Sequence, residues 1–244
     1  MKNKPLAIDA SANYVNLERL TFLFDGVYAI TITLLVLELR LPDEGAPQLL
    51  DGLLGMLPRL FIYFIAFYSL ANHWVVHQRM FRHITAADSV VLWLTLLELL
   101  FITLIPVTTA LVGRFPGEKL AVACFSANSF LHALTNWIFW VYVVKKQEQF
   151  AAHSDPHLLA ITAQVWLVIS VGWLISVPVG YLNVNAAYVT WIVWPNLVAV
   201  WAKYKRRGLE SITFHEANKA PNRRNRPDQY KLAGNKHFRK RNIS

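Results

Sequence analysis

The 244-residue sequence has little charge and almost no cysteine. Only 16% of its residues are Asp, Glu, Lys or Arg, against about 25% in an average soluble domain. Cys124 is the single cysteine, which excludes a disulfide scaffold. With 55% hydrophobic residues, most of the chain is too apolar to be disordered. The low charge and the high apolar content favour a membrane protein over one or two soluble domains.

The charge that is present is segregated along the chain. Residues 203–244 hold 13 Lys and Arg against 3 Asp and Glu, whereas the first 202 residues hold 11 basic and 12 acidic groups. The basic character therefore belongs to the end of the chain. We predict three parts: a cytosolic N-terminus (1–19), a transmembrane domain (20–202) and a basic, largely disordered cytosolic tail (203–244).

Apolar runs of the length that a membrane-crossing helix needs, about 20 residues, recur along the body. They cover residues 20–41, 60–78, 89–113, 120–144 and 158–202, and the last is long enough for two crossings. Pro, Gly and two Asn within Pro178–Asn185 predict the break between those two. The sequence thus predicts an all-α membrane protein with six transmembrane helices per subunit.

Basic residues in the loops predict the orientation of these helices. Two loops on the side of the N-terminus contain Arg79, Arg82, Lys145 and Lys146, and the basic tail follows the last span directly. We therefore expect a multi-pass protein with both termini in the cytosol. Residues 1–19 are polar and no small-residue cleavage site follows the first apolar stretch, so no cleavable signal peptide is expected.

The basic tail has two interpretations. As a solvated anchor it would act only through the excess of positive charge on the cytosolic side. Alternatively, it would bind anionic lipid head groups, or nucleic acid, through its Lys and Arg side chains. The surrounding apolar body favours a lipid bilayer as the partner, and no nucleic-acid partner is expected.

The first span differs from an ordinary lipid-facing helix because it contains Asp25 and Glu38. Acidic groups at membrane depth normally face the protein interior or water, so this helix is expected inside the bundle. Helical spacing gathers one face, which consists of Gly26, Ile30, Thr33, Leu34 and Leu37. This stripe is either ordinary helix packing or, in an oligomer, the lining of a narrow apolar constriction.

Other polar residues lie within the spans. His73 and His77 are four residues apart, a spacing that suits a metal or haem, but no carboxylate or cysteine pattern accompanies them, so hydrogen-bonded histidines are favoured. Glu98 is an intramembrane acid, interpreted either as an ion- or proton-handling group or as an interhelical hydrogen-bonding group. No enzyme motif accompanies them, so neither an enzyme nor a resident metal is expected.

The first span resembles the first helix of the transmembrane protein 175 family of lysosomal and bacterial potassium channels. The family motif reads Arg-x-x-x-Phe-Ser-Asp, followed by a run like Gly-Val-Phe-Ala-Ile-x-Ile-Thr-Leu-Leu-Val-Leu. Arg19 and Asp25 match at this spacing, with Leu23 and Phe24 in place of Phe and Ser, and residues 26–37 match the run. Weaker similarity extends over residues 15–200.

The resemblance implies a homotetramer in the bacterial inner (plasma) membrane, with the first helix lining the pore. Ile30, Leu34 and Leu37 would form the hydrophobic constriction, and Thr33 would contribute to ion selectivity. Potassium would be the permeant ion and no cofactor is implied. A structural hydrogen-bond network is implied for Arg19, Asp25, His73, Trp74 and His77. His73 and Trp74 are the donors expected for Asp25.

Two other functions stay open at this point. A proton- or cation-coupled secondary transporter would use Asp25, Glu98 and the histidines, and would show saturable flux. A non-conducting membrane scaffold would act through its basic tail and show no flux. Internal inverted repeats would favour the transporter, and none is evident in the sequence.

Overall fold

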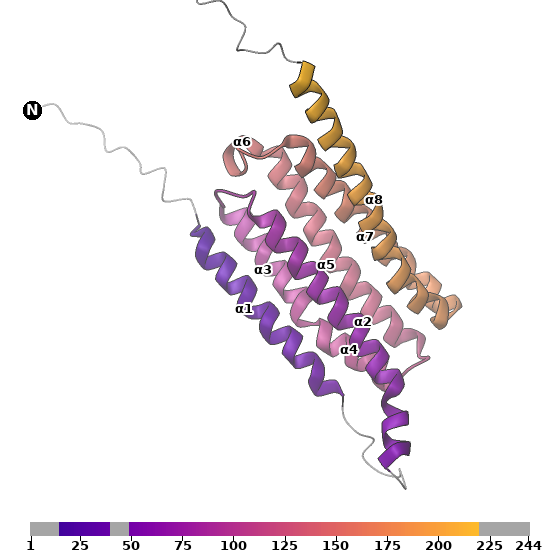
Figure 1. The fold of residues 1–244 in the computed structure, drawn as a ribbon. Helices are drawn as coiled ribbons and strands as arrows, with labels where there is room; N and C mark the ends of the chain where they lie inside the picture. Colours follow the sequence, from indigo (N-terminus) through magenta and orange to yellow (C-terminus); the bar gives the residue numbers. More distant parts are fainter. Residues whose placement is uncertain (1–14, 40–48, 220–244) are drawn as a thin grey trace, which may run out of the picture. The chain divides into compact units, whose positions relative to one another are not determined.

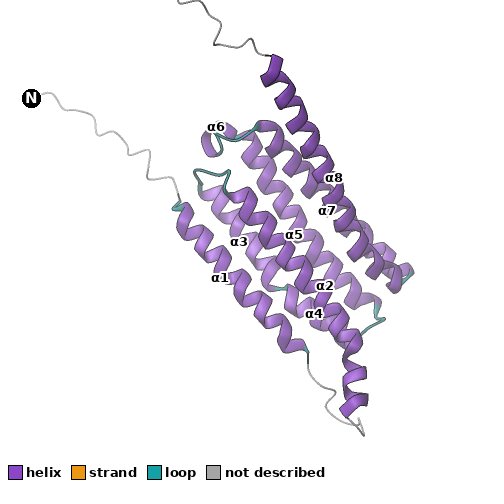
Figure 2. Cartoon of the chain, viewed as in Figure 1, coloured by secondary structure: helices purple, strands orange, loops and turns teal. Residues whose placement is uncertain are grey.

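The computed structural model describes residues 15–39 and 49–219, in which every element is a helix (Figure 2). The elements are α1 (Leu17–Leu35), the 3-10 helix η2 (Val36–Glu38), α2 (Leu49–Phe81), α3 (Ser89–Thr103), α4 (Ile105–Arg114), α5 (Lys119–Lys145), α6 (Gln147–Phe150), α7 (Pro156–Leu182) and α8 (Val184–Lys219). The chain divides into two compact units, Met1–Lys205 and Arg206–Ser244. The helical bundle belongs to the first unit, and the all-α prediction is confirmed.

The long helices of the first unit run alternately in opposite directions (Figure 1). Loops at one end of the bundle contact one another: the Val15 N–H donates to Ala87 O at 2.8 Å, and the Thr85 N–H donates to Phe150 O at 2.7 Å. The start of α1, the α2–α3 loop and the α5–α7 connection therefore share one end. The two basic loops predicted to lie on the side of the N-terminus do lie together there.

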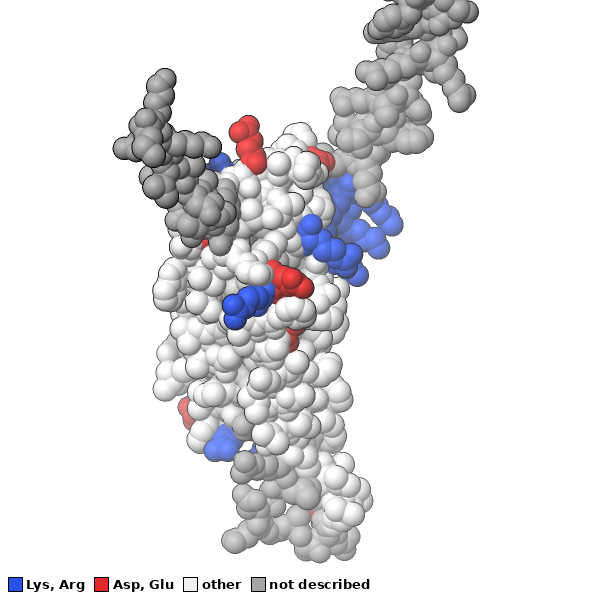
Figure 3. Space-filling model, turned by 90° about the vertical axis from the view of Figure 1, so that its left-hand side faces the viewer, with Lys and Arg blue, Asp and Glu red and all other residues white. Residues whose placement is uncertain are grey.

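Within residues 15–39 and 49–219, three segments are long and apolar enough to cross a membrane: Leu49–Phe81, Ser89–Arg114 and Pro156–Leu182. The remaining three predicted crossings correspond to α1, α5 and α8, and these stay a prediction. The bundle carries many exposed apolar side chains, such as Phe64 on α2, Leu174 on α7 and Val200 on α8. Figure 3 shows a broad surface without charge between the charged side chains near the two ends of the bundle.

Helix α1 begins and ends earlier than the predicted range of 20–41. Asn16 caps its start, where Oδ1 accepts the Arg19 N–H at 3.0 Å. Side-chain caps of this kind satisfy one of the free N–H groups in the first turn. The α-helix ends at Leu35 and tightens into η2, which ends at Glu38. Residues 40–48 lie outside the described part of the chain.

The predicted third span is two helices in line. Helix α3 ends at Thr103, and α4 begins at Ile105 with Pro106 in its first turn. Proline has no N–H to donate to the preceding turn, so it favours a new helix start over a continuous helix. Asp88 caps α3 at the other end, where its Oδ1 accepts the N–H groups of Val90 and Val91.

The break between the last two helices is shorter than Pro178–Asn185. Pro178 lies inside α7, and the chain leaves helical geometry only at Asn183. The prediction was too wide because proline is tolerated within membrane helices when packing satisfies the freed backbone groups. Asn183 then starts α8, since its Oδ1 accepts the Ala186 N–H at 3.2 Å.

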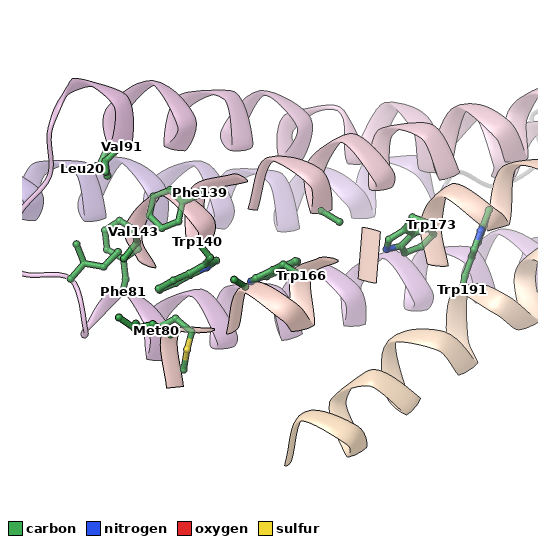
Figure 4. Packing of buried hydrophobic residues seen from close by; sticks show 14 of the residues in the cluster. Leu20, Met80, Phe81, Val91, Phe139, Trp140, Val143, Trp166, Trp173 and Trp191 are labelled. Atoms are coloured by element: carbon green, nitrogen blue, oxygen red, sulfur yellow. The ribbon is translucent and has the colours of Figure 1, made fainter. Parts of the chain in front are cut away.

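Two clusters of buried side chains hold the bundle together. The larger is rich in aromatic rings from α5, α7 and α8, among them Phe139, Trp140, Trp166, Trp173 and Trp191 (Figure 4). The smaller attaches α1 to the helices that follow it. Its members are Phe24, Tyr28, Leu35, Ala66, Leu70, Leu99, Ile102 and Ile105. Most of the buried side chains of α1 thus belong to the smaller cluster, whereas Leu20 belongs to the larger one.

An aromatic side chain of α8 lies directly against the backbone of α7. A side chain at Gly172 would overlap the ring of Trp194, whose Nε1 donates to Val168 O at 3.0 Å. The absence of a side chain at Gly172 therefore makes room for the ring of Trp194. Helix α8 continues through Lys219, so the first residues of the predicted tail are helical. Residues 220–244 lie outside the described part.

Candidate functional site

Helix α1 is buried along one face only. Phe24, Tyr28, Thr31 and Leu35 are all at most 1% exposed, and they follow one another at helical spacing. This periodicity places the four side chains on the face that packs against α2, α3 and α4. Helix α1 is therefore fixed in rotation relative to the rest of the bundle.

The opposite face of α1 is the stripe singled out in the sequence. Gly26, Ile30, Thr33, Leu34 and Leu37 are all exposed in the subunit, with Ile30 at 60% and Leu37 at 57%. A stripe used for packing within the subunit would be buried, so these five residues do not serve packing within the subunit. The stripe is available to lipid or to other subunits.

Thr33 is the polar member of this face. Its hydroxyl donates to the backbone oxygen of Ile30 at 2.8 Å, which uses its only hydrogen. The lone pairs of the oxygen that remain are acceptors on an exposed surface. Such an oxygen suits a cation, because hydroxyl and carbonyl oxygens replace water in ion-selective sites.

Asp25 is held by donors from α2. Trp74 Nε1 donates to Asp25 Oδ1 at 2.9 Å, and Gln78 Nε2 donates to the same oxygen at 3.4 Å. Of the two donors expected from the sequence, Trp74 is therefore the one in place, and Gln78 was missed. His73 does not serve Asp25; its Nδ1 lies 2.8 Å from the hydroxyl of Tyr28.

His77 and Arg19 take positions different from the implied network. The ring of His77 is buried between Phe24 and Phe81, with ring centroids 3.4 Å and 4.5 Å away. Arg19 is exposed in the first turn of α1, where its backbone N–H bonds the Asn16 cap. An interior role for the Arg19 side chain is therefore not met within the subunit.

Glu98 lies close to two buried histidines from other helices. Its Oε1 lies 3.3 Å from Nε2 of His73 on α2 and 3.8 Å from Nε2 of His132 on α5. All three side chains are buried. Sequence reasoning missed His132 and Tyr28 as members of this group. The available signal was a histidine in the middle of an otherwise uncharged span, at residues 120–144.

Comparison with known proteins gives consistent results. A family model described as endosomal/lysosomal potassium channel TMEM175 matches residues 19–106. A potassium channel of Chamaesiphon minutus is 29% identical over 147 residues, which cover 57% of this chain and 72% of the relative. One of Streptomyces collinus is 26% identical over 164 residues, covering 65% and 80%.

A vertebrate relative and a solved structure extend the comparison. The endosomal/lysosomal proton channel TMEM175 of Gallus gallus is 24% identical over 225 residues, which cover 81% of this chain but 44% of that protein. The crystal structure of a TMEM175 homologue from Chamaesiphon minutus has a TM-score of 0.68 at 22% identity. It covers 76% of this chain and 97% of that chain, so the two share a fold.

Proposed function

Because the chain belongs to the transmembrane protein 175 family, whose members are ion channels and not enzymes, we propose that it is a potassium-permeable cation channel of a membrane. The proposal includes a homotetramer in a bacterial plasma membrane, crossed six times by each subunit, with both termini in the cytosol. Conduction is passive, down the electrochemical gradient, and potassium is the permeant ion.

One observation carries this proposal: α1 is buried against the bundle along one face and exposed along the opposite face. Ile30, Leu34 and Leu37 are 60%, 42% and 57% exposed on a helix whose other side is almost fully buried. In a tetramer with α1 nearest the axis, these side chains face one another across the pore. Contacts between neighbouring α1 helices then replace contacts with lipid tails by van der Waals packing.

The proposed mechanism follows from the chemistry of these side chains. Rings of Ile30, Leu34 and Leu37 form a constriction that excludes water when narrow, and conduction requires that it widen or hydrate. Thr33 contributes a ring of hydroxyl oxygens within the same stretch of helix. Because its hydrogen is committed to the backbone, the oxygen is oriented to accept, and it can replace part of the hydration shell of a cation.

Ion flux into liposomes tests the proposal. Purified protein is reconstituted, and uptake of potassium is compared with uptake of sodium under the same gradient. We expect potassium flux to exceed sodium flux and to rise with the gradient without saturation. The control is an equal amount of protein inactivated by heat before reconstitution. Absence of flux from folded, inserted protein would contradict a channel and favour a scaffold.

A secondary transporter is the second candidate, because Glu98 lies buried between two histidines. Such a group is typical of proton relays in pumps and transporters. This function predicts that flux saturates with substrate and that Glu98→Gln abolishes it. The channel predicts that flux through Glu98→Gln persists in folded protein, because Glu98 lies behind α1 and not on the exposed stripe.

A further inference from the structure

Three side chains with metal-binding atoms meet in the interior of the subunit, away from the exposed face of α1. His73 comes from α2, Glu98 from α3 and His132 from α5. Their exposed fractions are 7%, 2% and 9%. One ligand atom from each lies within 4.8 Å of the other two. Three helices are thus tied to one point by nitrogen and oxygen atoms.

Two of these atoms have unmet bonding capacity. Nε2 of His73 and Oε1 of Glu98 are buried and make no hydrogen bond, although they lie 3.3 Å apart. A buried polar atom without a partner costs about 1–3 kcal/mol, and more when it is charged. A cation placed between the nitrogen and the oxygen would satisfy both.

We propose that His73, Glu98 and His132 bind a divalent transition metal ion, with Zn²⁺ as the best match. Two imidazoles and one carboxylate are a ligand set that zinc commonly takes, leaving a fourth position for water. Zinc binds nitrogen at about 2.0–2.1 Å, so two ligand atoms at a tetrahedral angle are about 3.3 Å apart. The 3.3 Å between Glu98 Oε1 and Nε2 of His73 equals this value, and Nε2 of His132, at 3.8 Å, would move slightly inward on binding.

The surroundings of the histidines also suit a metal. Metal-binding histidines use the second ring nitrogen to hold a partner, and Nδ1 of His73 lies 2.8 Å from the Tyr28 hydroxyl. Asn136 Nδ2 lies 3.4 Å from Nε2 of His132, which is a long contact that an ion would replace. The same amide keeps a bond to the backbone oxygen of His132 at 3.2 Å.

The metal would affect α1 through its buried face, which is opposite the face proposed to line the pore. Tyr28 is 1% exposed and belongs to the buried face of α1, whereas Ile30 belongs to the exposed face. A metal on His73 fixes the ring that holds Tyr28, and so it strengthens the attachment of α1 to α2, α3 and α5. Metal binding by the three side chains does not require that the protein conduct ions, so it is measured without a flux assay.

Zinc binding by the full-length protein in detergent tests the site. The protein is stripped with a chelator and titrated with Zn²⁺, and bound metal per subunit is measured together with the Tm. We expect one Zn²⁺ per subunit and a higher Tm with metal. Affinity should fall at least about tenfold in His132→Gln and in Glu98→Gln. His157→Gln, at an exposed histidine in the first turn of α7, is the matched control and should bind like wild type.

A milder variant protects the test against loss of folding. Tyr28→Phe keeps all three ligands and most of the packing, but it removes the hydroxyl near His73, so we expect binding about tenfold weaker than wild type. Co²⁺ replaces Zn²⁺ as a visible probe, and wild type should show the absorption of a four-coordinate ion. The proposal is overturned if folded wild type takes up no Zn²⁺, if Co²⁺ gives only a six-coordinate spectrum, or if Glu98→Gln binds zinc unchanged.

Discussion

The ring of Phe24 on α1 stacks face to face on the ring of His77 on α2, with centroids 3.4 Å apart and planes at 7°. Phe24 occupies the position at which the family motif has serine. Its ring also lies 4.6 Å from that of Tyr28, so two aromatic side chains anchor α1. These aromatic contacts attach the first half of α1 to α2.

Restoring the motif serine should therefore weaken the subunit. Phe24 is 1% exposed, and truncating a buried phenylalanine typically costs about 3–5 kcal/mol. We expect Phe24→Ser to lower the Tm of the purified protein and its yield of oligomer, measured by thermal unfolding and size-exclusion chromatography. Phe22→Ser, at a 68% exposed position of the same helix, is the control. Equal stability of the two variants would contradict an anchoring role for Phe24.

The hydrogen bond from Trp74 to Asp25 makes a separate prediction. Bonds to charged groups contribute about 1.5–3 kcal/mol, so Trp74→Phe should destabilise the protein by about that amount. Trp93→Phe on α3, where the side chain is 69% exposed, should be near neutral.

Asp25→Ala should damage assembly or gating more than ion selectivity, which the reversal potential reports. A shifted reversal potential with normal assembly and gating would refute this role.

A polar side chain at Ile30 should hydrate the proposed constriction. We expect Ile30→Asn to raise potassium flux, and a barrier lowered by about 1.4 kcal/mol would give a tenfold increase. Ile175→Asn on α7 introduces the same polarity at a 48% exposed site on another helix. It should leave flux near the wild-type level. Similar flux from wild type and Ile30→Asn would remove Ile30 from the pore wall.

Two threonines on opposite faces of α1 provide a matched test of selectivity. Thr33 is exposed, whereas Thr31 is 1% exposed and its hydroxyl has no hydrogen-bond partner. Thr33→Val should lower the preference for potassium over sodium by about fivefold, which corresponds to about 1 kcal/mol for the ring of hydroxyls as a whole. Thr31→Val should keep wild-type selectivity. Reversal potentials in mixed potassium and sodium solutions distinguish them, and equal effects would exclude a selectivity role for Thr33.

Asp88 predicts a dependence of stability on acid pH. Partial burial disfavours its charge, but hydrogen bonds from Tyr142, the Val91 N–H and Lys146 outweigh this and hold the pKa of Asp88 below its usual value. A lowered pKa in the folded state stabilises the protein above the unfolded-state value, about 3.9. This contribution is lost as pH falls through the lower folded-state pKa.

The variant Asp88→Asn keeps a side chain that caps helices well but removes the charge. Its Tm should lie below that of wild type at neutral pH, and the difference should shrink below about pH 4. Asp155→Asn at the cap of α7 is the control for the same chemical change. A Tm difference for Asp88→Asn that stays constant from neutral to acid pH would contradict the charge contribution.

Local sequence patterns determined the helices and the two faces of α1. Long uncharged runs and helical spacing act over one or a few turns, so they predicted the body of α5 (residues 120–144) and the stripe of Ile30, Leu34 and Leu37. Helix ends were less predictable. Pro178 is compatible with a packed helix, and only the cap at Asn183 ends the run.

The meeting of distant side chains was decided by tertiary structure alone. His73, Glu98 and His132 are separated by tens of residues, and no spacing rule relates positions on three different helices. Packing of α2, α3 and α5 brings these three side chains close to one another. As a result His73 contacts Tyr28 and Glu98, and not Asp25 as the sequence had predicted. Sequence periodicity determines which face of a helix is apolar, whereas the rotation and register of neighbouring helices determine which polar groups touch.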